Sequence, residues 1–470
     1  MKEKLQKIAK NIYEIPQTGE MRVPARIFVS PQLLKHVDST CLEQLSNAAR
    51  LPGIVHYALG MSDVHVGYGL PIGGVIAFDL KKGVISPEAV GFDVNCGVRL
   101  LKTGLTRSEV EKKKDSLAKE LFKAIPSGNG KEQYLSLSVK ELDEVLERGL
   151  EWAQQKGYAN ATDRRFTEDR GKMKDADAQS VSAKAKERGR TQLGTLGSGN
   201  HFLEVQYVEK IMNKKAAATM GLKKDMVCVM IHSGSRGLGH EVAADYIGRI
   251  RAHYAQHDRH VLAHAPLDSP LGKQYMHAMH AAANFAFVNR QLMTHATREV
   301  FASLFSDGAL ELVYDLAHNI AKFEQLELNG KKTIVCVHRK GATRSFGPGR
   351  AELPNEYKKI GGPIFLPGSM GTASFVLVGT STAERLSLAS AAHGAGRVLS
   401  RSAALERYKP EDIQHALRKK GIILKARSEK SIPEEAPEVY KDVDEVARVT
   451  TELGLARAVA RLRPLVVIKG

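Results

Sequence analysis

Short runs of β-branched and aliphatic residues, separated by longer amphipathic stretches, limit most strongly what this chain can fold into. Four such runs (GGVIAF, MVCVMIH, TIVCVH and FVLVGT) predict buried strands at residues 73–78, 226–232, 333–338 and 375–380. Helical patterns lie between them, at residues 107–123, 139–156, 240–256 and 272–304. This mixture predicts an α+β fold, with mixed sheets flanked by helices, rather than a repeat protein.

The chain has 470 residues, a length that by itself allows two or three domains. It shows no internal repeat, no low-complexity tract and no linker, so we expect one large domain over residues 1–470. The stretch 162–190 is almost wholly polar and is the best candidate for a mobile loop or a surface helix.

The composition is basic, with 69 Lys and Arg against 52 Asp and Glu and a net charge of +17. Such a balance is typical of proteins that bind polyanions, although many basic proteins carry a solvated cationic surface with no nucleic acid on it. One Trp and 6% aromatic residues argue against a protein that coats single strands by base stacking.

The four cysteines (Cys41, Cys96, Cys228 and Cys336) show no C-x-x-C spacing, so we expect free thiols and a reducing compartment. The N-terminal residues have no apolar core of signal-peptide length, and no run of about 18 apolar residues occurs. These features predict a soluble cytoplasmic protein that does not enter a membrane.

The histidines form two groups. One group shows helical spacings of three or four residues: His253, His257, His260, His264, His277 and His280. Because this segment is polar and amphipathic, we expect a solvated helix face there rather than a metal site. The other group lies at strand ends, mostly beside glycine, where backbone can approach a ligand closely: His201, His232, His318 and His393.

Asp93 and Cys96 lie three residues apart in GFDVNCGVRL (91–100). Together with the strand-end histidines they offer the ligand types that divalent first-row metals take, and a thiolate can bridge two ions. Considered one at a time, these residues also have a simpler explanation. A free cysteine is commonly a small buried apolar residue, and a buried histidine is commonly a structural one. Ligand softness leaves Zn²⁺, Mn²⁺ and Mg²⁺ open.

The common nucleotide-binding motifs are absent from the sequence. Neither G-x-x-x-x-G-K-[ST] nor G-x-G-x-x-G occurs, and the Lys-x-Asp-Gly motif of lysine-dependent nucleotidyltransferases is missing as well. A nucleotide would therefore be held by another device, and a covalent nucleotide intermediate would have to form on a histidine.

A series of motifs covers most of the chain: MSDVHVGYGLPIGGV (61–75), VGFDVNCGVR (90–99), LGSGNHFLE (196–204), IHSGSRGLG (231–239), AHNIAK (317–322), HRKGATR (338–344), LPGSMGTASFVLVG (366–379), HGAGRVLSR (393–401) and VIKG (467–470). In these motifs the chain resembles the RtcB family of GTP-dependent RNA ligases. The resemblance implies an RtcB-like fold with a central cleft for metal and nucleotide.

The resemblance also implies a pair of Mn²⁺ ions bridged by the thiolate of Cys96. Asp93 and His201 would complete one metal site, and His232 and His318 the other. The choice of Mn²⁺ comes from the family alone.

His393 matches the histidine that receives GMP in the family. The resemblance implies three steps: a 2′,3′-cyclic phosphate end is opened to a 3′-phosphate, GMP moves from the histidine to that phosphate, and a 5′-hydroxyl attacks and expels GMP. Such a ligase would act in tRNA splicing, RNA repair or both.

The family's GTP contacts map onto Asn200, His201, Phe202, Leu203, Glu204, His318, Asn319, Pro367, Gly368, Ser369, Met370, Ser374, His393, Gly394, Ala395, Gly396 and Lys469. A carboxylate such as Glu204 can accept from guanine N1–H and the 2-amino group, while the ammonium of Lys469 can donate to O6. The simpler alternatives are an exposed strand residue for Glu204 and a solvated charge for Lys469.

Arg397 and Arg401 lie four apart and would share one face if residues 397–408 are helical, giving an RNA-phosphate clamp beside His393. Further RNA-binding candidates lie in motif loops: Arg236, Arg339 and Arg344. Asp63 matches an acidic family position near the metals but also suits a turn cap, and Tyr440 matches a position near the base within a weak motif.

Two other classes of function compete with a ligase. A dinuclear metal-dependent phosphodiesterase or nuclease would need the same metals but no nucleophilic histidine and no GTP pocket. A basic RNA-binding protein would explain the charge but not the set of metal-ligating residues. As partners we expect RNA ends, GTP and an activator of the archease type, and we expect a monomer.

Overall fold

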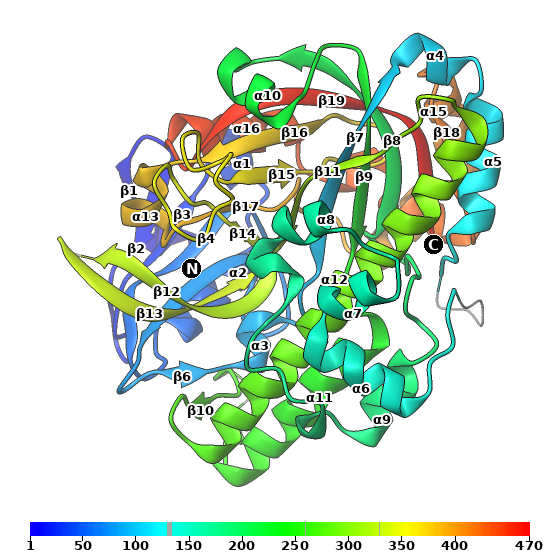
Figure 1. The fold of residues 1–470 in the computed structure, drawn as a ribbon. Coiled ribbons are helices and arrows are strands. Elements are labelled where there is room, and N and C mark those ends of the chain that lie inside the picture. The colour runs from blue at the N-terminus through cyan, green and yellow to red at the C-terminus, as the bar shows by residue number, and fades with distance from the viewer. Residues whose placement is uncertain (129–133, 259, 329) are drawn as a thin grey trace.

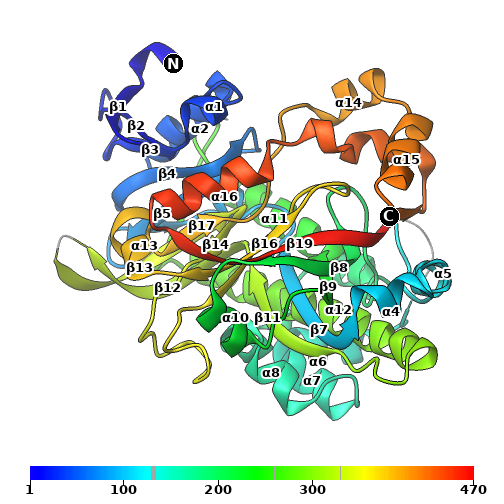
Figure 2. The same cartoon turned by 90° about the horizontal axis from the view of Figure 1, so that it is seen from above.

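The computed structural model describes residues 1–128, 134–258, 260–328 and 330–470. Helices and strands alternate along the chain and build two large mixed sheets with helices against them (Figure 1), which confirms the predicted α+β class. The N-terminal strands lie on the opposite side of the molecule from α5 (Lys114–Ala124) and α15 (Pro410–Lys419) in both views (Figures 1 and 2).

The first sheet is formed by the N-terminal strands and by a long hairpin from the middle of the chain. Its order is β1 (Gln6–Ala9), β2 (Ile12–Ile15), β3 (Ala25–Phe28), β4 (Ile54–His65), β5 (Ile72–Asp79), β13 (Lys331–Lys340) and β12 (Asn319–Leu328). All neighbours are antiparallel except β3 and β4.

The second sheet carries the longest strand, at the C-terminal end of the chain. Its order is β11 (Glu311–Ala317), β7 (Gly97–Thr106), β9 (Met226–Ser233), β8 (Phe202–Ile211), β19 (Ala456–Lys469), β16 (Ser374–Gly379) and β15 (Pro363–Leu366), with β18 (Ile423–Ala426) parallel to β19. Two short pairs accompany these sheets: β6 (Val84–Ile85) with β10 (Ala265–Pro266), and β14 (Ala342–Arg344) with β17 (Ser390–Ala392). The four predicted strands all occur, as parts of β5, β9, β13 and β16.

The helices are α1 (Pro31–Leu34), α2 (Ser39–Ala48), α3 (Pro87–Val90), α4 (Arg107–Glu111), α5 (Lys114–Ala124), α6 (Val139–Arg148), α7 (Leu150–Gln155), α8 (Ala161–Arg165), α9 (Ala183–Gly189), α10 (Lys214–Met220), α11 (Arg236–His253), α12 (Pro270–Leu304), α13 (Ser381–Ser387), α14 (Arg401–Arg407), α15 (Pro410–Lys419) and α16 (Val443–Glu452). Among the described residues, none of these helices is both long and apolar enough to cross a membrane.

Helix α12 passes through the interior of the molecule. Ser269 caps its N-terminus by accepting from the Gly272 amide, and Pro270 occupies the first turn, where a missing N–H costs nothing. Small and aromatic side chains are buried along most of its length, and its buried Arg290 pairs with Asp315 of β11 at 2.7 Å. The helix therefore packs against the second sheet and is tied to it by this ion pair.

The largest cluster of buried apolar side chains runs from Ile12 to Leu462 and draws on both sheets. A second cluster lies between α5, α12 and the second sheet, and a third joins α14, α15 and the segment around Ile432. The expectation of one domain over residues 1–470 stays a prediction.

Two predicted helices are each divided in the structure. The pattern at 107–123 forms α4 and α5, and the pattern at 139–156 forms α6 and α7. Gly149 separates the second pair with a φ of 51°, and a Cβ at this position would lie 2.3 Å from the carbonyl oxygen of Gly171. Only glycine permits this turn between two helices that share one amphipathic pattern.

The polar segment 162–190 contains short helices rather than an extended loop: the end of α8, η2 (Glu168–Gly171), η3 (Ala178–Ser180) and α9. Its charged side chains are partly buried because they meet partners from distant elements. Asp163 accepts from Arg298 of α12 at 2.7 Å, and Glu168 pairs with Lys322 of β12 at 2.9 Å.

The prediction of a helical, solvated face for the histidines of 253–280 is wrong in part. Helix α11 ends at His253, and the connection to α12 holds His257, His260 and His264 outside any helix. His280 lies on α12 but is buried, with 6% of its surface exposed. Among the described residues, no cluster able to hold a metal includes this group.

Candidate metal and nucleotide site

Four neighbouring strands bring the predicted metal ligands to one edge of the second sheet. Strands β11, β7, β9 and β8 pair antiparallel in that order, so the end of β11, the start of β7, the end of β9 and the start of β8 lie together. His318 follows β11, Cys96 precedes β7, His232 lies near the end of β9, and His201 precedes β8. Residues scattered over the sequence thus meet through strand pairing alone.

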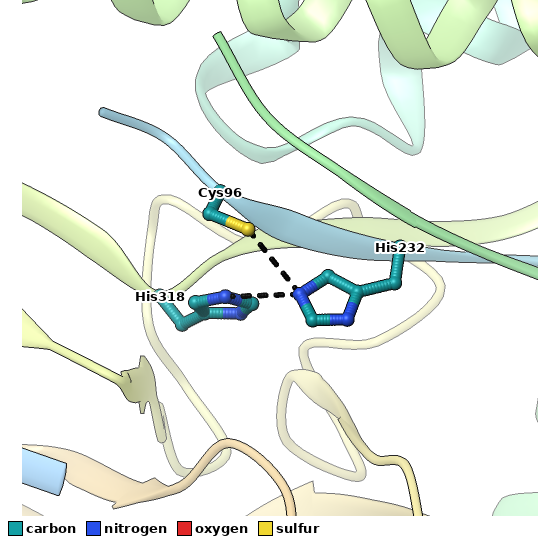
Figure 3. Close-up of side chains that lie close together, drawn as sticks. All are labelled: Cys96, His232 and His318. Atoms are coloured by element: carbon teal, nitrogen blue, oxygen red, sulfur yellow. Dashed lines mark hydrogen bonds between the residues drawn. The ribbon is translucent and has the colours of Figure 1, made fainter. Parts of the chain in front are cut away.

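The ligand atoms converge around the sulfur of Cys96. Sγ lies 3.2 Å from Nε2 of His232 and 3.4 Å from Nε2 of His201. Nε2 of His232 is 3.3 Å from Nε2 of His318, and these side chains point toward one another (Figure 3). On the other side, Oδ2 of Asp93 lies 2.9 Å from Nε2 of His201.

Cys96 belongs to two groups of potential ligands, one with His232 and His318 and one with Asp93 and His201. Within each group the ligand atoms lie within 4.8 Å of one another. Nδ1 of His201 donates to the carbonyl of Leu196 at 2.9 Å, which leaves Nε2 as the free lone pair.

The chemistry of these side chains fits a pair of divalent cations. Burial lowers the pKa values of His232 and His318 well below their ordinary range, so both imidazoles are neutral, as metal ligands must be. Burial raises the pKa of the Cys96 thiol, and a bound cation would reverse this effect by stabilising the thiolate. Thiolate, carboxylate and imidazole suit Zn²⁺ or Mn²⁺.

Hydrogen bonds hold the loops that carry these ligands. Nη1 of Arg290 donates to the carbonyls of Asn95 and Ser233, at 2.8 and 2.9 Å, and so links the Cys96 loop to the end of β9. The side-chain amide of Asn319 donates to the backbone carbonyl of Asp93 at 3.0 Å. The predicted GTP contact Asn319 thus braces the metal-ligand loop in this structure.

His393 directly follows β17 and is held by Asp63 near the end of β4. Oδ2 of Asp63 accepts from Nδ1 of His393 at 2.6 Å and from its backbone amide at 3.0 Å. Burial alone would raise the pKa of Asp63, but His393, Lys441 and His65 together outweigh it, and the pKa lies below its ordinary value. The ring of His393 lies 4.7 Å from that of His318, centroid to centroid.

A cavity opens beside His393 and His232, and most of the predicted GTP contacts line it. These are Asn200, Phe202, Glu204, Pro367, Gly368, Ser369, Met370, His393, Gly394, Ala395, Gly396 and Lys469. Leu203 does not, because neighbours along a strand point to opposite faces and its side chain packs in the apolar core behind the sheet. Ser374 is not among the residues that line the cavity, but its Oγ accepts from the side chain of Gln206 and from the backbone amide of the lining residue Gly368.

Glu204 and Lys469 both line this cavity, from the paired strands β8 and β19. Burial raises the pKa of Glu204 to about 7, and Gln206 donates to its carboxylate at 2.7 Å. Nζ of Lys469 donates to the carbonyl of Gly199 at 2.7 Å and to Glu435 at 3.0 Å. Both residues are buried in the cavity wall. Glu204 is therefore not an exposed strand residue, and Lys469 is not a solvated charge.

The comparison with known proteins agrees with this geometry. The family model described as tRNA-splicing ligase RtcB matches residues 44–470. The chain belongs to the RtcB family. It is therefore an enzyme of a family of RNA ligases, as its motifs predicted.

Curated relatives cover the whole chain. A protein of Methanococcus maripaludis named tRNA-splicing ligase RtcB is 48% identical over 100% of both chains, and one of Thermococcus kodakarensis with the same name is 48% identical over 99% of each. An Entamoeba dispar protein named RNA-splicing ligase RtcB homolog 1 is 45% identical over 92% of this chain and 82% of its own length.

The RNA-binding candidates lie in different surroundings from those predicted. Helix α14 begins at Arg401 and is capped by Ser400, so Arg397 is outside it and the two share no helix face. Both nevertheless line the cavity. Arg397 donates to Glu435 at 3.1 Å and to the hydroxyl of Tyr440 at 3.2 Å, whereas the side chain of Arg401 is 59% exposed.

The three further arginine candidates are held by protein groups. Arg339 is buried and makes a double hydrogen bond to Glu324, and Arg344 is bound by Glu324 and Glu168. Arg236 begins α11 and donates to Thr195 and to the carbonyl of Gly128. Burial of this kind indicates a structural role for Arg339 in particular.

Sequence patterns missed three residues that line the cavity beside His393: His65, Ile72 and the acidic Glu435. The carboxylate of Glu435 binds Lys469, Tyr440 and Arg397 together. It lies in SIPEEAPEV (431–439), a stretch with two adjacent glutamates and two prolines. Such a stretch is typical of an exposed turn, and nothing in it signals a buried carboxylate.

Proposed function

We propose that the protein joins an RNA 3′-phosphate or 2′,3′-cyclic phosphate end to a 5′-hydroxyl end, using GTP, in tRNA splicing, RNA repair or both. The observation that carries this proposal is His393, which is oriented by Asp63 and lies between the metal-ligand cluster and the nucleotide cavity. A ligase that works through a covalent nucleotide needs a nucleophile in this position.

Asp63 prepares His393 for attack. Because its carboxylate accepts the Nδ1 proton, the tautomer of His393 carries its lone pair on Nε2. This nitrogen would attack the α-phosphorus of GTP, forming a P–N bond while the P–O bond to pyrophosphate breaks. The histidine nitrogen then carries GMP in a bond that is readily transferred.

The donor set divides between two cations. Cys96 would be shared, with Asp93 and His201 on one side and His232 and His318 on the other. Bound Mn²⁺, or Zn²⁺ by ligand type, would supply positive charge against phosphate oxygens.

The later steps use the same cavity. Water opens a cyclic phosphate to a 3′-phosphate, whose oxygen then takes GMP from His393 to give an RNA-3′-pp-5′-G end. The 5′-hydroxyl oxygen of the second RNA attacks the RNA phosphorus, a phosphodiester forms, and GMP leaves. Arg397 and Arg401 at the cavity wall are the proposed phosphate contacts.

Guanine would be read by Glu204 and Lys469. The carboxylate accepts from N1–H and the 2-amino group and the ammonium donates to O6, an arrangement that leaves adenine with mismatched donors and acceptors. The backbone of residues 367–370 and 394–396 lines the rest of the cavity and offers N–H groups and small side chains to phosphates.

The test is an RNA-joining assay with two oligonucleotides, one ending in a 3′-phosphate and the other beginning with a 5′-hydroxyl. We expect joined product with GTP and Mn²⁺, none with ATP, and none after chelation of the metal. Joining of a 3′-hydroxyl to a 5′-phosphate instead would contradict the proposal.

A metal-dependent nuclease is the second candidate, because the metal-ligand cluster alone would suit it. The pair of Asp63 and His393 favours the ligase, since a metal-activated water needs no oriented histidine beside a nucleotide cavity. An activator of the archease type, a monomeric state and a cytoplasmic location stay predictions.

A further inference from the structure

A second cavity, of about 680 Å³, lies apart from the nucleotide cavity and shares no lining residue with it. Its walls come from η2 and the residues up to Asp175, from β12, β14 and α12, and from the segment 351–358. Neither the metal cluster nor the proposed reaction uses any of these side chains. The volume falls within the range of sites that bind a ligand the size of a nucleotide.

The cationic side chains of this cavity fall into two classes. Those of the first class are paired with carboxylates: Lys322 and Arg344 with Glu168 and Asp169, Arg165 with Glu356, and Lys172 with Glu151. Arg170, Lys174 and Lys358 also line the cavity, and no carboxylate of the described residues lies within ion-pair distance of them. Three positive charges are therefore available to a ligand, beside the carboxylate of Asp175, which also lines the cavity.

The backbone holds Arg170 on the cavity wall in a costly conformation. Asp169 and Arg170 both have left-handed φ values, 51° and 55°, and Gly171 follows with 69°. Non-glycine residues in this region cost of order 1–3 kcal/mol each. The ion pairs of Asp169 with Lys322 and Arg344 hold this turn in place.

An aromatic ring and a buried imidazole complete the cavity. Phe323 of β12 is 49% exposed, which is unusual for a ring of its size. His280 of α12 is 6% exposed, and its Nδ1 has no hydrogen-bond partner among the described residues. Burial lowers the pKa of His280 to about 4, so the ring is neutral and can donate or accept one hydrogen bond.

We infer that this cavity binds a nucleotide of the RNA substrate, with Arg170, Lys174 and Lys358 on its phosphates and Phe323 stacked on its base. Unpaired cations around an exposed aromatic ring match a single-stranded polynucleotide, since phosphates and π-faces recur along it. A small polyanion would not use the ring, and an acidic peptide would not need it. The inference rests on the proposed function for the identity of the polymer.

The position of the cavity suits a strand that also reaches the reactive histidine. Lys322 follows the metal-ligand candidate His318 by four residues on extended chain, which spans about 13 Å. Arg344 pairs across the β14–β17 ladder with Ser390, three residues before His393. Two elements of the reactive site therefore continue into this second cavity.

The experiment measures the affinity of a fluorescent single-stranded RNA with a 3′-phosphate, without GTP, over a range of salt concentrations. The variant Arg170→Asn/Lys174→Gln/Lys358→Gln removes the three charges, and asparagine tolerates the left-handed backbone at position 170. We expect the slope of log K against log[salt] to fall in magnitude by about 2, because each phosphate contact to a single strand contributes about 0.7. Phe323→Ser should weaken binding roughly tenfold at constant salt slope.

The matched control is Lys112→Gln/Lys119→Gln/Lys123→Gln, which removes three exposed charges at α4 and α5, on the far side of the molecule from the β12–β13 hairpin (Figures 1 and 2). It should change the slope less than the cavity variant does. An equal change in both, or wild-type RNA affinity in the cavity variants, would overturn the inference. So would unchanged RNA affinity with lost binding of a polyglutamate peptide, which would assign the cavity to an acidic protein.

GMP transfer from GTP without RNA separates this inference from the proposed function. The cavity variants should still take up GMP at the wild-type rate, because none of the changed residues touches His393 or its cavity. If wild type itself takes up no GMP, the proposed function fails, while a loss of RNA affinity confined to the cavity variants would still support an RNA site there.

Discussion

Asp63 is the single residue with the most direct influence on the proposed nucleophile. Its carboxylate fixes the tautomer and the rotation of His393 through Nδ1. We predict that Asp63→Ala lowers the rate of GMP transfer to the protein by about 10- to 100-fold, the usual cost of losing a partner that orients a histidine. The variant Asp63→Asn keeps an acceptor oxygen, so its rate of GMP transfer should lie between those of wild type and Asp63→Ala. The rate of label uptake from GTP checks this, and a wild-type rate in Asp63→Ala would refute the role.

Glu204 should make nucleotide affinity depend on pH. Its pKa in the free protein is raised to about 7 by burial, and in the proposed contact guanine would bind its ionised form, so that binding would lower the pKa. GMP affinity should therefore increase as pH rises through about 7 and level off above it. Calorimetric titration between about pH 6 and 8 measures this. Glu204→Gln should bind GMP more weakly and lose the dependence, and an unchanged pH profile in that variant would contradict the assignment.

Helix α12 supports the geometry of the candidate metal ligands through one buried arginine. Arg290 pairs with Asp315 and also holds the carbonyls beside Cys96 and His232. Arg290→Met leaves that network incomplete in the interior and should lower the free energy of unfolding by about 3–5 kcal/mol. Denaturant titration measures the loss.

The control for this change is Arg298→Met on the same helix, whose partner is Asp163 and whose side chain is 22% exposed. Because solvent screens this pair in part, the free energy of unfolding should fall less. An equal loss of free energy of unfolding in the two variants would show that the buried network of Arg290 contributes no more stability than the partly exposed pair of Arg298.

The strand and helix patterns were predictable because periodicity is a local property, and β9, β13 and α12 follow it. Local patterns failed where a tertiary contact decides the conformation. Arg397 has a helical spacing to Arg401, but Glu435 and Tyr440 hold it outside the helix. Sequence alone gave no means to rank these competing contacts.

For the molecule as a whole, the sequence indicated which residue types could bind a metal, but it did not show that these residues lie together in space. Cys96 and His318 are brought together by strand order, and Asp63 meets His393 across 330 residues of chain. The resemblance to the RtcB family implied that Cys96 and His318 meet, but it placed Asp63 only near the metals, and its pairing with His393 comes from the structure. The cavity around Arg170 and Phe323 was not predicted, because only Lys322 and Arg344 of its wall lie in the motifs and its other residues come from separate elements.

His393 is proposed to carry GMP as a covalent intermediate, and uptake of label from α-³²P-GTP with Mn²⁺, read after denaturing electrophoresis, tests this. We predict a label on wild type that is labile to acid, is absent with ATP, and is lost in His393→Ala and Cys96→Ala. Cys41→Ala, which removes a buried thiol of α2 that belongs to neither group of potential metal ligands, is the control and should label normally. A label that persists in His393→Ala, or wild type that cleaves RNA but never takes up GMP, would contradict the account.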